Sequence, residues 1–189
     1  MNLINEFRLH SLEYALWSRA LANALKFRTD SIDAVYERLL REPLDIYRTA
    51  RNFYGPEMSE QYLNYLTQQV ISFRNLTEAL INNDYQNADR YWQSWNHTGD
   101  QIADFLAGLN PYWDKALWQQ LLQEYHLMVY YEILAILSGD YRREIEIFDR
   151  IVDHTIIMAD HMSRGLIQNL AHTAPEASPP AQSEDNPAV

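Results

Sequence analysis

Apolar residues recur every three or four positions along almost the whole chain, and long stretches contain neither glycine nor proline. A period near 3.6 residues is typical of amphipathic helices, whereas strands alternate with a period of two. The pattern therefore predicts an all-α fold, an antiparallel bundle of five long helices and two short ones. The long helices are expected at about residues 3–26, 57–82, 85–109, 110–137 and 141–170.

Proline and glycine mark the expected breaks between these helices. Pro43 is expected to stop the first short helix, and Gly55 ends the second, with Pro56 opening the next long helix. Asn110 followed by Pro111 resembles a helix start, so we expect a helix from there to about residue 137. Gly99, on the apolar stripe of its helix, marks either a weak point or a close helix contact.

The chain divides into a predicted bundle domain, residues 1–171, and a tail, residues 172–189. The tail is rich in proline, alanine and serine and has no large apolar residue before its final valine, so we expect it to be disordered. A chain of 189 residues is long enough to build one hydrophobic core without disulfides.

Charge and cysteine content narrow the range of partners. The net charge of −11 would repel phosphate backbones and anionic lipid surfaces, so we expect neither nucleic acid nor a membrane as a partner. No stretch has the 18 or so apolar residues that a membrane span needs. The absence of cysteine excludes disulfides and thiolate sites, and it fits a cytoplasmic protein.

The segment "HLMVYYEILAIL" places Glu132 in the middle of an apolar helical stripe. An unpaired buried carboxylate costs several kcal/mol or takes up a proton, so Glu132 should have a tyrosine, arginine or histidine partner. His126 lies on another face of the same helix, which is therefore expected to be buried nearly all round. The simplest interpretation is a polar group satisfied within the core.

Three further polar residues share this position within apolar stripes, namely Tyr14, Gln69 and Asp160. Each alone is explained by an aromatic core with scattered polar anchors. Because they come from separate helices, a shared polar pocket that binds a ligand is a second interpretation.

The same residues offer no standard metal motif. Di-iron bundles use repeated Glu-x-x-His pairs, and no such pair is present in the sequence. His154 and His161 could face one way on a helix, but they border its polar side and are expected to be surface residues. A small enzyme that uses His126 and Glu132 as acid and base is a weaker alternative. No cofactor is predicted.

The chain resembles a family of small all-helical proteins of spore-forming Gram-positive bacteria that often carries the label acetylglutamate kinase. The resemblance covers about residues 2–169. It rests on the segments "ALWSRA", "NFYG", "WNHTGDQIADFL", "LNPYW", "EYHLMVYYE", "SGDYRREIEIFDRIVDHTIIMAD" and "GLIQNL". The kinase activity is not expected, because a helical chain with five glycines lacks the glycine-rich phosphate loops of that enzyme class.

The resemblance implies a set of polar site residues. Asp100, His126, Glu132 and Asp160 match the family pattern, whereas Tyr14 and Gln69 stand where the family has histidines. We therefore predict a non-enzymatic protein that binds a small polar ligand or a protein partner through these six residues. The alternatives are a metal-binding bundle that uses His126, Glu132, Asp160 and Asp100, and a degenerate enzyme.

Overall fold

In the computed structural model, which describes residues 3–173, the chain forms helices and no strand. The helices are α1 (Leu3–Phe27), α2 (Ile32–Leu39), α3 (Arg41–Ile81), α4 (Tyr85–Leu109), α5 (Lys115–Ser138) and α6 (Tyr141–Thr173). The predicted all-α bundle is confirmed. The predicted domain boundary falls two residues before the end of α6, and the rest of the predicted tail lies outside the described residues.

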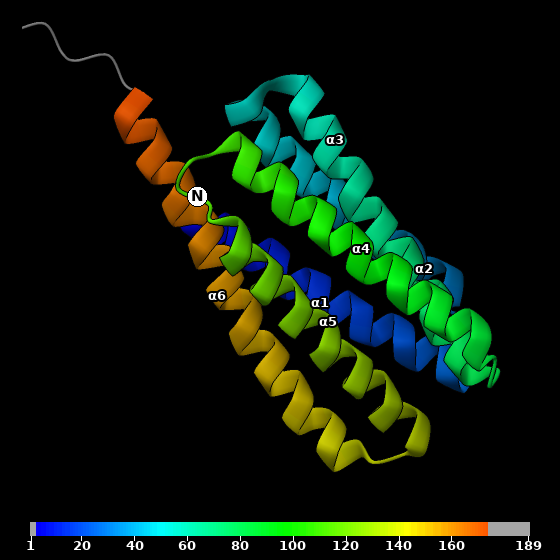
Figure 1. Ribbon diagram of the computed structural model, residues 1–189. Coiled ribbons are helices and arrows are strands. Elements are labelled where there is room, and N and C mark those ends of the chain that lie inside the picture. Colours follow the sequence, from blue (N-terminus) through cyan, green and yellow to red (C-terminus); the bar gives the residue numbers. More distant parts are fainter. Residues whose placement is uncertain (1–2, 174–189) are drawn as a thin grey trace, which may run out of the picture.

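The long helices lie along a common direction, and successive ones run in opposite senses (Figure 1). Each of α3, α4 and α5 packs against the next helix in sequence, and α1 closes the bundle by packing against both α3 and α6. Helix α1 also contacts α5. Residues on α1 can therefore meet residues from α3, α5 and α6 in the interior.

Helix α3 bends sharply at Gly55, whose φ of 75° and ψ of 176° are not helical. A positive φ favours glycine, and Pro56 restarts the helix at its first turn, where a missing N–H costs nothing. The Ser59 hydroxyl donates to the Gly55 carbonyl at 2.7 Å and fixes the bend. The short segment before Gly55 and the long one after it are thus the two elements that the sequence predicts.

Pro43 does not stop the first short helix as predicted. That helix, α2, ends four residues earlier at Leu39, and Pro43 lies in the first turn of α3, a position that proline tolerates. The consequence is that Glu42, just before this proline, is turned into the interior and is fully buried.

The prediction that Asn110 and Pro111 begin a helix is also wrong. Asn110 follows the end of α4, its side chain accepts a hydrogen bond from the Tyr112 N–H at 2.9 Å, and α5 begins at Lys115 behind the N-cap Asp114. The intervening Trp113 is buried and donates its indole N–H to the Met162 carbonyl of α6 at 3.2 Å. This anchoring of the loop to α6 competes with early helix formation.

The apolar core consists of two clusters. One surrounds Leu21, Leu76 and Ile133, and the other surrounds Phe7, Leu106 and Leu166. Among the described helices, none combines the length and apolar character needed to cross a lipid bilayer.

Candidate functional site

A cavity of about 110 Å³, partly open to solvent, lies where the two core clusters meet. Its walls are mostly apolar and aromatic, and they come from α1, α3, α4, α5 and α6. A water needs roughly 10–15 Å³ by the same kind of measure, so the space is large enough for several waters or for a molecule of about one ring. The polar side chains that line it are His10, Ser11, Tyr14, Tyr62, Gln69, Tyr125, His126 and Thr155.

Three of the six predicted site residues line this cavity. Tyr14 comes from α1, Gln69 from α3 and His126 from α5. The Tyr14 ring lies beside the Tyr125 ring, with centroids 6.4 Å apart. Burial raises the pKa of the Tyr14 phenol, and the negative charge of Glu42 adds to that effect, so the hydroxyl stays protonated as a hydrogen-bond donor.

His126 is almost completely buried and makes polar contacts through both ring nitrogens. Its Nε2 lies 2.8 Å from the Gln69 Oε1, and its Nδ1 lies 3.2 Å from the Asn96 Oδ1. The two amide groups are themselves held, because Gln69 donates to the Trp95 carbonyl at 3.1 Å and Asn96 donates to the Trp92 carbonyl at 2.9 Å. The position of this histidine is therefore set by helices α3 and α4.

Burial lowers the pKa of His126 to about 3, so its imidazole is neutral near pH 7. A neutral imidazole has one N–H. We assign that proton to Nε2, since Nε2 makes the shorter contact and its acceptor, Gln69, is the more buried amide. Gln69 thus serves as the hydrogen-bond acceptor that fixes the tautomer of His126.

Gly99 makes room for this ring. A Cβ atom at Gly99 would lie 2.8 Å from the His126 Cε1, closer than carbon atoms pack. The Trp95 ring, one turn earlier on α4, stacks on the imidazole with centroids 4.3 Å apart. Of the two readings of Gly99 from the sequence, the close helix contact is the one that the structure shows.

Glu132 lies near an arginine, but its Oε1 is buried and accepts no hydrogen bond. The Arg19 Nε lies 3.8 Å from the Glu132 Oε1, whereas Arg19 makes its hydrogen bonds to Glu144, at 2.5 and 2.9 Å. One guanidinium thus lies near two buried carboxyl groups and hydrogen-bonds to one of them. Desolvation and the charge of Glu144 raise the pKa of Glu132 to about 8, against the opposing effect of Arg19.

The other two predicted residues have partners of their own. Asp160 accepts hydrogen bonds from the Arg8 guanidinium at 2.6 and 2.8 Å, an ion pair between α1 and α6. Asp100 accepts a hydrogen bond from the Gln119 amide at 3.2 Å and links α4 to α5. Neither of them, nor Glu132, contributes to the cavity wall.

Three polar atoms of the cavity wall residues have no hydrogen-bond partner. They are the His10 Nδ1, the Trp118 Nε1 and the Tyr125 hydroxyl, and all three are buried. Buried polar groups are nearly always paired with protein or ordered water, so these three favour a polar occupant of the cavity. All three residues lie in apolar helical stripes, and none of them is among the site residues predicted from the sequence.

His154 and His161 are not the surface residues that the sequence suggests. His154 is buried, and its Nε2 lies 2.8 Å from the Leu121 carbonyl of α5. His161 is half-buried against Trp118, with ring centroids 5.1 Å apart. The face of α6 that packs against the other helices is wider than its apolar stripe in the sequence indicates. It therefore includes both histidines.

A group of ligand-type side chains lies elsewhere. Within residues 3–173, the one cluster of three or more histidine or acidic side chains whose ligand atoms lie within 4.8 Å of one another is His10, Glu13 and Glu42. None of the four residues predicted as a metal set belongs to it. Sequence reasoning missed Glu42 because its burial depends on the turn between α2 and α3.

No family model, curated protein or solved structure matches this chain.

Proposed function

We propose that this protein is a non-enzymatic binding protein for a small molecule of about one ring, held in the central cavity. The observation that supports the proposal is the cavity itself, whose volume is about 110 Å³ and whose walls are mainly apolar with a few polar side chains. Small-molecule sites usually have this composition, since apolar walls provide affinity and a few polar groups fix the orientation.

The polar atoms indicate the chemistry of the ligand. The Trp118 Nε1 is a donor without a partner, and Tyr14 is a protonated phenol on the same wall. These groups would suit a ligand with at least one oxygen acceptor. The proposed ligand is therefore an aromatic or similarly flat molecule with a hydroxyl or carbonyl group, which narrows the small polar ligand that the sequence predicts.

The arrangement gives less support to the alternatives from the sequence. His126 and Glu132 are held by different partners, and only His126 lines the cavity, so an acid–base pair between them has no common substrate position. The resemblance to the family labelled acetylglutamate kinase, like the cytoplasmic location, stays a prediction. A protein partner is not needed to explain the interior polar groups.

Ligand binding can be tested with two probes of similar size, phenol and toluene, on the full chain. We expect phenol to raise the melting temperature more than toluene at equal concentration, because only phenol has a polar group for Trp118 and Tyr14. Ala159, on the wall from α6, is changed to leucine to fill the cavity. In Ala159→Leu the phenol effect should disappear while the fold is retained.

The matched control is Ala34→Leu on the exposed side of α2, which should leave phenol binding unchanged. If Ala159→Leu still responds to phenol as the wild type does, the cavity is not the binding site. If neither phenol nor toluene raises the melting temperature of the wild type, the proposal is also contradicted.

A further inference from the structure

The cluster of His10, Glu13 and Glu42 contains more than an ordinary surface ion pair. His10 and Glu13 are three residues apart on α1 and so share one face of that helix, and Glu42 reaches the same place from the first turn of α3. Their ligand-type atoms lie within 4.8 Å of one another. Three donor groups from two helices therefore converge on one point.

Arg38 is the cation that this cluster already has. It lies on α2, donates to the Glu42 Oε1 and has its Nη2 3.5 Å from the Glu13 Oε2. The guanidinium also stacks over the Trp17 ring, 4.8 Å from its centroid, which holds it to one side of the cluster. One guanidinium against two carboxylates leaves one negative charge unbalanced.

Two buried atoms of the cluster have no partner. Glu42 is fully buried, and its Oε2, the oxygen that Arg38 does not hold, accepts no hydrogen bond. The Nδ1 of His10 is also buried and unpaired. A carboxylate oxygen that is buried and unpaired bears the full desolvation penalty of a charged group, so such an oxygen in a folded protein indicates a missing partner such as an ion or a water.

We infer that His10, Glu13 and Glu42 form a binding site for a divalent transition-metal ion of the zinc class. One imidazole nitrogen and two carboxylate oxygens are a donor set that such ions accept, with a remaining position open to water. The imidazole disfavours Mg²⁺ and Ca²⁺, which prefer all-oxygen sites. The site differs from the metal set predicted from the sequence, and it shares His10 with the wall of the proposed ligand cavity.

The geometry requires only a small adjustment on binding. Bonds of about 2.0–2.2 Å in a tetrahedral site place ligand atoms roughly 3.4 Å apart. The ligand atoms of the three side chains lie within 4.8 Å of one another, and rotation of these side chains can bring them to that spacing. Arg38 would keep its contacts with the Glu42 Oε1 and the Glu13 Oε2, so its positive charge would compete with the ion for the two carboxylates.

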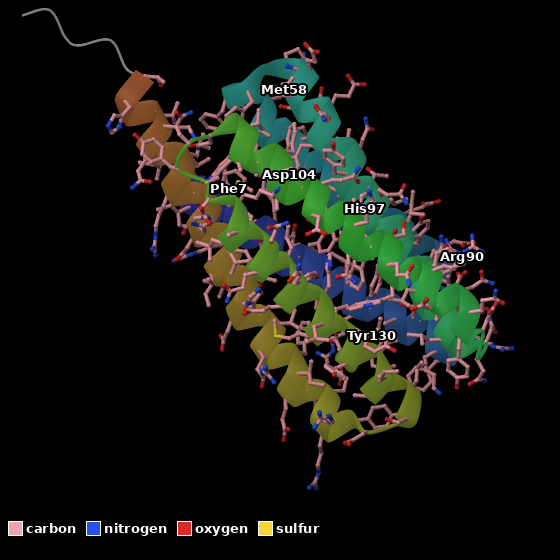
Figure 2. The ribbon with its side chains drawn as sticks, viewed as in Figure 1. Phe7, Met58, Arg90, His97, Asp104 and Tyr130 are labelled. Carbon is pink, nitrogen blue, oxygen red and sulfur yellow. The ribbon has the colours of Figure 1, made fainter. Side chains whose placement is uncertain are left out.

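The test is a Zn²⁺ titration of the full chain after removal of metals with a chelator, read with a chromophoric competitor. We expect one Zn²⁺ per chain and the appearance of Co²⁺ absorption bands when Co²⁺ replaces it. His10→Gln and Glu42→Gln should each weaken binding by about 100-fold or more. The controls are His97→Gln on the exposed face of α4, labelled in Figure 2, and Glu37→Gln on exposed α2, and both should leave affinity unchanged.

Arg38→Gln gives an outcome that a purely structural cluster does not predict. Removing the competing positive charge should tighten Zn²⁺ binding, even though it removes the partner of Glu42. If Glu42→Gln does not fold, Glu13→Gln, at the more exposed edge, measures the same loss. Absence of stoichiometric Zn²⁺ in the wild type, or equal weakening in His97→Gln, would overturn the assignment. Phenol binding measured with and without chelator separates this result from the cavity proposal.

Discussion

His126 and Glu132 lie six residues apart on α5, and the helix buries both of them. His126 is surrounded by neutral groups, with two amide oxygens at its nitrogens and an aromatic ring on its face. Glu132 lies among charges, sharing Arg19 with Glu144. The comparison shows two ways to bury an ionisable group in one helix.

Both environments favour the neutral form near pH 7, although the two groups would ionise to opposite charges, histidine to a cation and glutamate to an anion. Burial moves the pKa of His126 down to about 3 and that of Glu132 up to about 8. At neutral pH the central helix therefore carries no formal charge at either position. A neutral imidazole needs only dipoles to satisfy it, whereas the carboxyl group is neutral because burial and the charge of Glu144 raise its pKa more than Arg19 lowers it.

The largest effect is expected when the His126 ring is removed. His126→Ala leaves a void beside Trp95 and an unpaired buried oxygen on Gln69. Together these should lower the free energy of unfolding by about 3–4 kcal/mol. Urea denaturation measures this, with His97→Ala, at an exposed position on α4, as the control that should change stability little. A loss below about 1 kcal/mol would mean that the ring is not part of the packed core.

The pH dependence of stability distinguishes Glu132 from His126. A raised pKa means that the folded state binds the extra proton between about pH 4.5 and 8, so the stability contributed by Glu132 is complete below pH 4.5 and is lost as pH rises through 8. For His126, the lowered pKa has the opposite consequence: its contribution is complete above about pH 6.5 and is lost as pH falls toward 3.

Glu132→Gln isolates the first of these contributions, since glutamine keeps the shape and cannot ionise. We expect the variant to differ from the wild type by less than about 1 kcal/mol at pH 6 and to gain about 1–2 kcal/mol relative to it at pH 9. Denaturation curves across this range test the slope. The control is Glu60→Gln, at an exposed position, whose free energy of unfolding should vary with pH as that of the wild type does. If the free energy of unfolding of Glu132→Gln also followed the wild type across this range, the assigned environment would be refuted.

The sequence predicts the secondary structure of this protein better than it predicts the site. The helical periodicity and the Gly55 break are local features, so they could be read without knowing the packing. The helix start at Asn110 could not, because the indole of Trp113 is anchored to a carbonyl on α6, far away in the sequence. Tertiary contacts there override a local signal.

Prediction of the site from the sequence is limited in the same way. Polar residues within apolar stripes correctly indicate burial for Gln69, His126 and Glu132. Periodicity gives the face of a helix but not its neighbours, so it could not show that Glu132 turns to Arg19 while His126 turns to Gln69. The sequence around Glu42 does not indicate that this residue is buried, because its burial depends on the turn between α2 and α3.

The last prediction concerns two glycines of α4. Gly99→Ala places a Cβ 2.8 Å from the Cε1 of His126, whose ring is held by the Gln69 Oε1 and by stacking on Trp95. The crowding should cost about 1–3 kcal/mol, more than the roughly 1 kcal/mol that alanine gains over glycine in a helix. Gly108→Ala, on the same helix with open space around its Cβ, should stabilise by about 0.5–1 kcal/mol.

Gly99→Ala and Gly108→Ala are expected to change the free energy of unfolding in opposite directions. Combining each of them with His126→Ala tests the environment of His126. With the ring gone, the Cβ at Gly99 no longer meets a fixed atom, so Gly99→Ala should stabilise that background as Gly108→Ala does. The coupling is measured as the difference between the two Gly99→Ala effects in urea denaturation. A Gly99→Ala cost that persists without the imidazole would show that another contact, and not the clamped ring, requires glycine at this point of α4.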